Sequence, residues 1–120
     1  PNRTAAPVAQ QLRLAEAAAE VDAARTLHRA AVRDILDRGE QGGSFPALDR
    51  ARLVRDASFA VRLCVQAANR LYDASGARGI MDGEPMQRLH RDVHAASHHA
   101  ALNWDTAAEQ FGRQALGIEA

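Results

Sequence analysis

The sequence is poor in the residues that stabilise secreted and membrane-embedded proteins. It has one cysteine in 120 residues, Cys64, so no disulfide can form within the chain, and the neighbouring Leu63 and Val65 indicate a buried thiol. No apolar run approaches the roughly 20 residues that cross a bilayer. The start, PNRTAAPVAQQ, lacks the apolar core of a signal peptide. We therefore expect a cytoplasmic protein with no membrane partner.

An excess of charge of either sign is also lacking. The 15 basic and 15 acidic residues give a formal net charge of zero and are distributed along the whole chain. A basic surface that would attract nucleic acid is not indicated, so we expect no nucleic-acid partner. The length of 120 residues predicts a single domain with a modest core. Because the chain does not begin with methionine, we expect a processed product or a piece of a longer protein.

Aromatic residues make up only 4% of the chain, and no stretch alternates apolar and polar residues as a strand does. Apolar residues recur instead at steps of three, four or seven, the spacing of one helix face. This pattern predicts helices over about 6–38, 47–75, 86–102 and 105–116. The expected stripes are Leu14, Ala17, Val21, Ala24, Ala31 and Ile35; Val54, Ala57, Val61, Cys64, Ala68 and Leu71; and Leu89, Val93, Ala96 and Ala100. We expect an all-α fold, an antiparallel up-and-down four-helix bundle.

Glycine, proline and aspartate mark the expected helix ends. Gly39 marks the end of the first helix, Pro46 can open the second, and Gly76 can cap the end of the second. Asp105 is the expected N-cap of the last helix, because its carboxylate can accept the free amides of the first turn.

Four of the five histidines lie within QRLHRDVHAASHH at 87–99. On a continuous helix, which turns about 100° per residue, His90, His94 and His98 follow one flank at four-residue steps. Imidazoles at this spacing can share a metal ion. No carboxylate or thiolate supports them, no Glu-x-x-His motif occurs, and Arg91 would repel a cation. We therefore expect no metal site, and we interpret His90 and His94 as a solvated or subunit-facing polar flank.

His99 falls on the opposite flank of such a helix, together with Arg88 and Asp92. Two interpretations are open for it. It is either a histidine at the edge of the core, satisfied by a neighbouring acceptor, or a general base poised near neutral pH. Periodicity does not decide between them.

Two segments carry a resemblance to a known family: QRLHRDVHAASHHAALNWDTAAEQFGRQALG at 87–117 and NRLYDASGARGI at 69–80. They resemble the C-terminal helical domain of the acyl-CoA dehydrogenase superfamily, in particular its two-component, flavin-dependent aromatic monooxygenases. Gln87, Arg88, Arg91 and Asp92 match a core that the dehydrogenase and monooxygenase branches share. VHAASHHAALNWD and FGRQALG are similar to the monooxygenase branch, and YDASGARGI departs from the glutamine and paired glycines of true dehydrogenases. The similarity covers roughly residues 48–118.

The resemblance implies an oxidoreductase that hydroxylates an aromatic or similar small substrate with oxygen and reduced flavin, FMN or FAD, supplied by a flavin reductase. It implies that His99, with His98 as the fallback, acts as base toward a phenolic substrate. It places Ser75, Gly76 and Arg78 in a loop that approaches the flavin, and we expect an ion pair between Arg88 and Asp92. The family's N-terminal helical domain and β-domain are absent from these residues, so this chain alone should be inactive. Family members assemble as tetramers, so we expect self-association as a dimer or tetramer.

Three other interpretations remain. The chain could be the C-terminal domain of an acyl-CoA dehydrogenase or a non-catalytic helical oligomerisation module. It could also be a small metal-binding bundle, which stoichiometric metal in elemental analysis would reveal.

Overall fold

A computed structural model describes residues 7–76 and 83–119. Within these ranges the chain forms four α-helices and no strand: α1 (Val8–Glu40), α2 (Ala47–Ala74), α3 (Pro85–Ser97) and α4 (Trp104–Leu116). A short 3-10 helix, η2 (Ala100–Leu102), lies between α3 and α4. The predicted all-α fold of four helices is confirmed.

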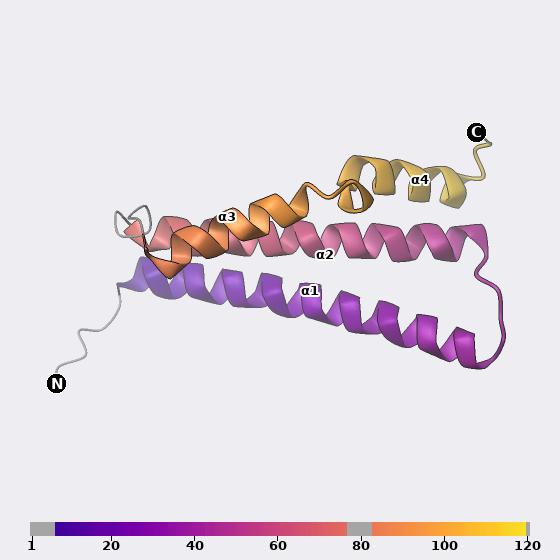
Figure 1. The fold of residues 1–120 in the computed structure, drawn as a ribbon, viewed down its shortest axis with the longest axis horizontal. Coiled ribbons are helices and arrows are strands. Elements are labelled where there is room, and N and C mark those ends of the chain that lie inside the picture. The colour runs from indigo at the N-terminus through magenta and orange to yellow at the C-terminus, as the bar shows by residue number, and fades with distance from the viewer. Residues whose placement is uncertain (1–6, 77–82, 120) are drawn as a thin grey trace.

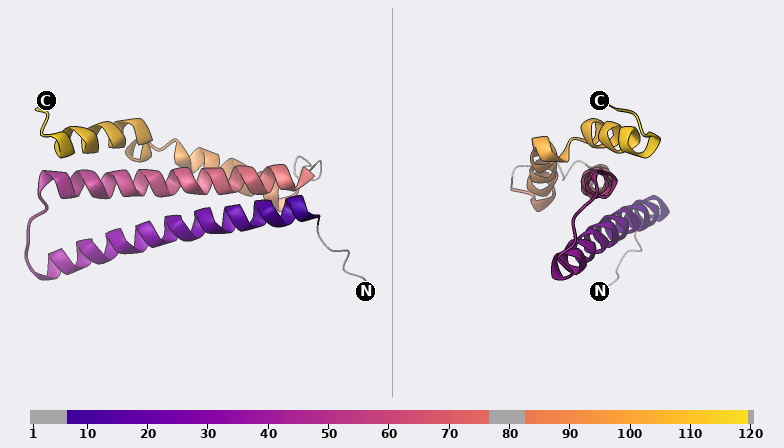
Figure 2. Two further views of the ribbon diagram at one scale, coloured as in Figure 1. Left: turned by 180° about the vertical axis from the view of Figure 1, so that it is seen from behind. Right: turned by 90° about the vertical axis from the view of Figure 1, so that its right-hand side faces the viewer.

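Helix α2 occupies the centre of the molecule. Helix α1 runs antiparallel to it on one side, and α3 and α4 lie along another side (Figures 1 and 2). The chain does not reverse between α3 and α4, so the two short helices together form a third leg antiparallel to α2 (Figure 1). The result is an elongated molecule with extents of 59 × 28 × 25 Å.

The core is made of small side chains. Every fully buried residue among those described is an alanine or a serine, and each is at most 9% exposed: Ala17, Ala24, Ala51, Ser58, Ala60, Ala67 and Ala107. Alanine combines high helix propensity with a short side chain, so neighbouring helices can approach closely. Each such contact buries little apolar area, which limits the stability that this domain gains by itself.

The predicted stripes are partly wrong about which residues are covered. On α1, Ala17 and Ala24 are buried as expected, but Leu14 and Ile35 are 62% and 46% exposed. On α2, Val54 is 40% exposed and Ser58 is buried. The reason is that α2 contacts helices on two sides, so its buried residues do not follow one apolar stripe.

One predicted helix end and one predicted N-cap are also wrong. Helix α3 ends at Ser97, five residues before the expected end, and the last helix begins at Trp104. Its N-cap is Asn103, whose Oδ1 accepts the Thr106 N–H at 2.9 Å, while Asp105 lies in the first turn. An asparagine cap satisfies one of the amides that a helix start leaves free.

Ion pairs join α1 to α2 near the connection between them. Arg38 donates to Asp34 and to Asp49, each at 3.0 Å, and Arg52 donates to Asp34 at 2.7 Å. Hydrogen bonds from Arg38 and then Arg52 hold the pKa of Asp34 below its ordinary value. At the other end of helices α1 and α2, Arg70 forms ion pairs with Glu16 and Glu20.

Candidate functional site

The break between α3 and α4 carries His98 and His99. His98 is the C-cap of α3, and His99 is the N-cap of η2 with extended backbone at φ −59° and ψ 132°. Both residues are exposed. The Ala101 N–H donates to His99 Nδ1 at 3.2 Å. His99 therefore stands on a short non-α segment, where its imidazole is open to a substrate or to another part of a larger protein.

This bond to Ala101 fixes the protonation pattern of neutral His99. A nitrogen that accepts a hydrogen bond carries no proton, so the proton of the neutral ring is on Nε2. In the observed arrangement His99 presents an N–H donor at Nε2. Taking a proton there requires the other tautomer and loss of the bond to Ala101.

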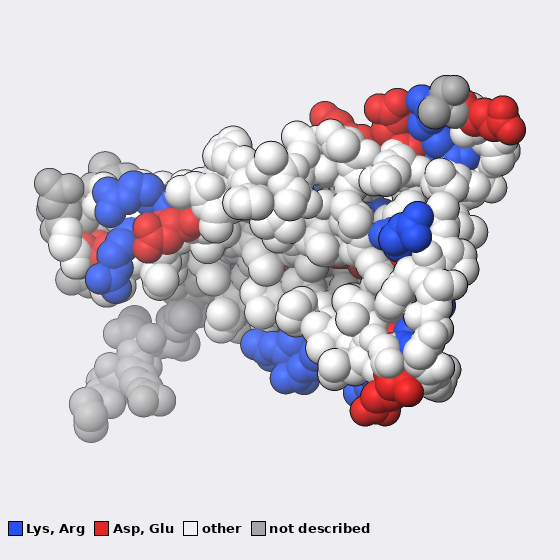
Figure 3. Space-filling view, turned by 45° about the vertical axis from the view of Figure 1, so that its right-hand side comes forward, with Lys and Arg blue, Asp and Glu red and all other residues white. Residues whose placement is uncertain are grey.

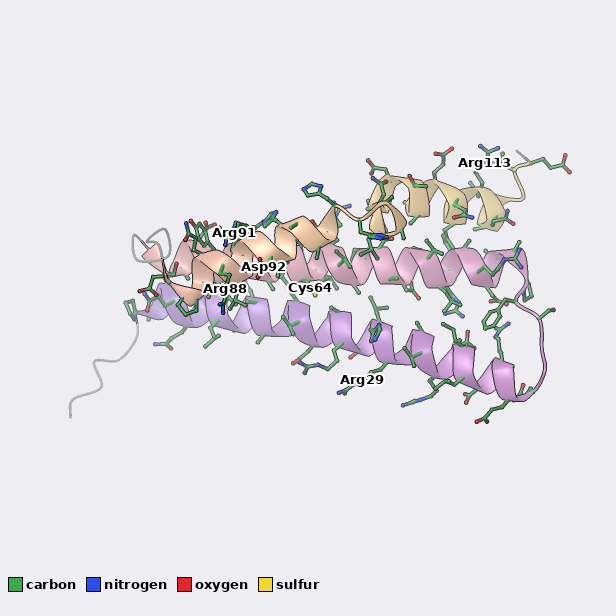
Figure 4. All side chains as sticks on the ribbon, viewed as in Figure 1. Arg29, Cys64, Arg88, Arg91, Asp92 and Arg113 are labelled. Atoms are coloured by element: carbon green, nitrogen blue, oxygen red, sulfur yellow. The ribbon has the colours of Figure 1, made fainter. Side chains whose placement is uncertain are left out.

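The predicted grouping of His99 with Arg88 and Asp92 is wrong. It assumed one helix through residue 102, whereas α3 ends at Ser97 and the 100° rotation per residue no longer applies beyond it. The expected ion pair is wrong as well: Arg88 and Asp92 both lie on α3 (Figure 4) and are exposed, and their side chains form no ion pair with each other.

Trp104 anchors the C-terminal side of the break to α2. Its ring centroid lies 5.4 Å from that of Phe59, at an interplanar angle of 50°. The guanidinium of Arg62 lies 5.4 Å from the Trp104 centroid. Aromatic and cation–π contacts of this kind add to the area that they bury. The backbone from His98 to Asn103 is thus held between the end of α3 and an indole fixed on α2.

His90 and His94 do not form the solvated flank that we expected. Both are half-buried against α2, and the Nε2 atoms of both lie within hydrogen-bond distance of Asn69 Oδ1, at 2.9 and 2.7 Å. The His90 ring also stacks on Tyr72, with centroids 4.2 Å apart. One carbonyl oxygen has two lone pairs and can accept both bonds, provided that each ring carries its proton on Nε2. The pair is therefore part of the α2–α3 contact.

The orientation of α3 about its own axis explains why the prediction for His90 and His94 is wrong. The half-buried face of α3 consists of Met86, Gln87, His90, Val93, His94 and Ser97, whereas Leu89 is 52% exposed. Over residues 7–76 and 83–119, no cluster of three or more His, Cys, Asp or Glu side chains is arranged to hold a metal ion.

The loop expected to approach flavin begins at the end of α2. Ser75 is the C-cap of this helix, and its Oγ donates to the Tyr72 carbonyl at 2.6 Å. Gly76 has φ +62°, the left-handed conformation that favours glycine, and a Cβ built there would meet nothing within 4 Å. Arg78 lies outside the described residues.

The structure does not bring Gly76 together with His99. Gly76 follows the C-terminal end of α2, which lies near the N-terminal end of α3 (Figure 1), whereas His99 follows the C-terminal end of α3, a helix of 13 residues that spans about 20 Å. Within one chain, Gly76 and His99 therefore lie at two separate places and do not form one site.

The face of the molecule shown in Figure 3 carries its acidic and basic side chains in small scattered groups, with uncharged surface between them. Among the described helices, none has both the length and the apolar character needed to span a membrane.

The acyl-CoA dehydrogenase C-terminal domain family matches residues 2–104. A resorcinol hydroxylase oxygenase component that depends on FADH2, from Rhizobium sp. (strain MTP-10005), is 37% identical over 98% of this chain and 30% of its own length. The oxygenase component of p-hydroxyphenylacetate 3-hydroxylase from Acinetobacter baumannii is 34% identical over 90% of this chain and 26% of its own length.

The fold of this chain is also similar to that of solved structures. The HsaA monooxygenase from M. tuberculosis superposes with a TM-score of 0.89 at 32% identity, over 98% of this chain and 31% of its own. XiaF from Streptomyces sp., solved in complex with FADH2 and glycerol, gives a TM-score of 0.89 at 27% identity over 94% of this chain and 28% of its own. The chain spans about 30% of the length of the relatives it matches. The predicted resemblance is confirmed: the chain belongs to the acyl-CoA dehydrogenase C-terminal domain family, and its relatives include flavin-dependent monooxygenase oxygenase components.

Proposed function

We propose that the protein containing this chain is the oxygenase component of a two-component, flavin-dependent monooxygenase that hydroxylates a phenolic small molecule. The observation that carries the proposal is an exposed histidine, His99, at a helix break in a chain similar to several such oxygenase components. A separate reductase would supply the reduced flavin. The lone cysteine and the dependence on a reductase fit the cytoplasm, where we place the enzyme.

His99 is the proposed proton acceptor for the phenol, with His98 as the alternative. A phenolate is a far better electron donor than a phenol, and a positioned base typically contributes about 10²- to 10⁴-fold to such a step. With the Ala101 N–H on Nδ1, the exposed Nε2–H can donate to the phenol oxygen. Accepting the phenol proton at Nε2 follows a tautomer exchange that releases the Ala101 amide, which is a small cost for an exposed bond of 3.2 Å.

The described residues fit the rim of a flavin site. The open side of Gly76 lets a ligand approach the backbone closely, and the Ser75 hydroxyl, though donating to Tyr72, keeps a lone pair free. Arg78 is part of the same proposal. When bound, the flavin supplies the activated oxygen, whereas these residues contribute contact and orientation. Most of the pocket would come from other domains, so we expect this chain alone to bind FMN or FAD weakly or not at all by fluorescence titration.

The proposal also includes self-association of the enzyme. At 100° per residue, four large apolar side chains fall on one side of α1 and are 40–62% exposed, which is typical of a face that another subunit covers: Leu14, Val32, Ile35 and Leu36. The separation of Gly76 from His99 supports flavin sites shared between subunits. Light scattering should report a dimer or tetramer, and a monomer at high protein concentration would contradict this proposal.

The test of the catalytic proposal is His99→Asn in the full-length enzyme. Asparagine is a good helix N-cap and can still accept the Ala101 N–H, so the break should keep its shape. We expect reduced flavin to be oxidised at a similar rate, product formation to fall by about 10²-fold or more, and hydrogen peroxide to replace the product.

Two matched variants make the test specific. His28→Asn changes an exposed histidine on α1 and should leave the coupling of flavin oxidation to hydroxylation unchanged. His98→Asn should have a small effect. If His98→Asn abolishes hydroxylation and His99→Asn does not, the base is one position earlier. If neither matters, the catalytic proposal fails.

A further inference from the structure

The segment that joins α3 to α4 has the composition of a helix. Residues 98–103 read HHAALN, and no glycine or proline lies between Pro85 and Gly112. Alanine and leucine are good helix formers. The bonds within the break are long: the Ala101 N–H donates to His99 Nδ1 at 3.2 Å, and the Asn103 N–H donates to the Ala100 carbonyl at 3.4 Å. Exposed bonds of this length stabilise a conformation little, so a contact with another part of the fold is needed to select the break.

Trp104 supplies such a contact. It is the first residue of α4 and is half-buried. Its ring lies against Phe59, with 5.4 Å between the centroids, and the Arg62 guanidinium lies 5.4 Å from the Trp104 centroid. Both partners belong to α2, the helix on which α3 also packs. Within residues 98–103 only Leu102 is half-buried, and the other five are exposed. Trp104 is therefore the main anchor on the C-terminal side of the break.

A continuous helix would separate Trp104 from Phe59. His99 has extended backbone, and residues 100–102 form a 3-10 helix. An extended residue advances the chain by about 3.3 Å and a 3-10 residue by about 2.0 Å, against about 1.5 Å in an α-helix. If α3 continued to residue 102, Trp104 would be drawn back by about 3 Å. A gap of about 1 Å already forfeits up to half of a van der Waals attraction, so the continuous helix and the contact with Phe59 exclude each other.

We propose that Trp104 is a positioning residue for His99. Its contact with α2 selects the break at residues 98–103, and the break sets the backbone on which the imidazole stands. Without that contact α3 continues through the segment, and at about 100° per residue His99 turns to the flank of α3 that carries Arg88 and Asp92. The effect on hydroxylation rests on the proposed function of His99, whereas the effect on the break does not.

Crystal structures of the full-length protein and of its Trp104→Ala variant test whether Trp104 controls the break. In the variant we expect α-helix through residue 102. The Ala101 N–H should then donate to the Ser97 carbonyl instead of to His99 Nδ1. If Trp104→Ala keeps the break and the bond to His99, the proposal is wrong.

A second aromatic residue of α4 provides the matched control. Phe111 lies under the Arg55 guanidinium, 4.1 Å from the ring centroid, and holds α4 on α2 two turns beyond Trp104. Phe111→Leu should leave the break and the hydroxylation unchanged. Phe59→Leu removes the ring that Trp104 contacts, so it tests the same contact from α2 if Trp104→Ala does not fold.

The amount of product formed per oxidised flavin tests the positioning of His99. Because a misplacement of about 1 Å can cost about 10²-fold in rate, Trp104→Ala should lower this ratio by about tenfold or more, while flavin oxidation stays within about twofold. Trp104→Phe keeps an aromatic ring against Phe59 and should restore most of the ratio. In a His99→Asn background, Trp104→Ala should cause no further loss, because both changes act through the same imidazole.

The outcomes separate this proposal from the proposed function. If Trp104→Ala removes the break but leaves the ratio unchanged, while His99→Asn lowers it, Trp104 does not position His99. A further loss in the double variant would show that Trp104 acts by another route. If His99→Asn leaves the ratio unchanged, the proposed function of His99 fails, whereas the crystal structures still confirm or overturn the control of the break by Trp104.

Discussion

Removing the Ser58 hydroxyl should make the chain more stable. Ser58 is 1% exposed in the middle of α2, and its Oγ has no hydrogen-bond partner among the residues that the structure describes. Leaving a buried polar group unpaired costs about 1–3 kcal/mol. Alanine also favours a helix over serine by roughly 0.5 kcal/mol. Against these gains stands the lost packing of one oxygen atom. For Ser58→Ala we expect a net increase of about 1–2 kcal/mol in the free energy of unfolding.

Urea unfolding followed by far-ultraviolet circular dichroism measures this change. Because self-association adds to apparent stability, parent and variant must be compared at one protein concentration. Ala57→Ser is the matched control. It places serine at the exposed neighbouring position and should lower the stability by about 0.5 kcal/mol through helix propensity alone.

Two results would show that the Ser58 hydroxyl is paired in solution. If Ser58→Ala lowers the free energy of unfolding, or raises it by no more than the roughly 0.5 kcal/mol expected from helix propensity, the hydroxyl has a partner in solution.

Three further predictions concern other parts of the fold. Gly39→Ala should stabilise α1 by about 0.5–1 kcal/mol, whereas Gly42→Ala, at φ +64°, should destabilise the chain by about 1–2 kcal/mol. If thermal unfolding shows that both variants shift the stability in the same direction, the prediction is wrong. Asn69→Ala, which removes the acceptor shared by His90 and His94, should cost about 1–2 kcal/mol in urea unfolding, and Gln66→Ala on the exposed side of α2 should cost little. Arg38 and Arg52 lower the pKa of Asp34. The contribution of ionised Asp34 to stability is therefore present above about pH 3.9 and is lost as pH falls through the lowered pKa. Asp34→Asn should therefore be less stable than the parent at neutral pH, and unfolding curves of the two should converge in strong acid.

Local physics explains what could be read from the sequence. Helix periodicity and helix-ending residues act over a few neighbours, so spacing alone predicted the helices, and Gly76 adopts the left-handed conformation directly after the C-cap Ser75 of α2. The segments at 69–80 and 87–117 carried the family resemblance for the same reason, since they are runs of residues that need no knowledge of distant contacts.

Contacts between helices decided the rest. Ala100 and Ala101 are good helix formers, yet α3 ends at Ser97; the break coincides with the local caps by His99 and Asn103 and with Trp104 packing on Phe59 of α2. Likewise, periodicity placed His90 and His94 on a polar flank, whereas Asn69 and Tyr72 of α2 supply the partners that allow two imidazoles to be half-buried. The burial of Ser58 arises because α2 is covered on two sides. The sequence by itself determined the helices, because hydrogen bonds within a helix are local, and only the tertiary structure determined which faces are buried, because burial depends on residues brought together from distant parts of the chain.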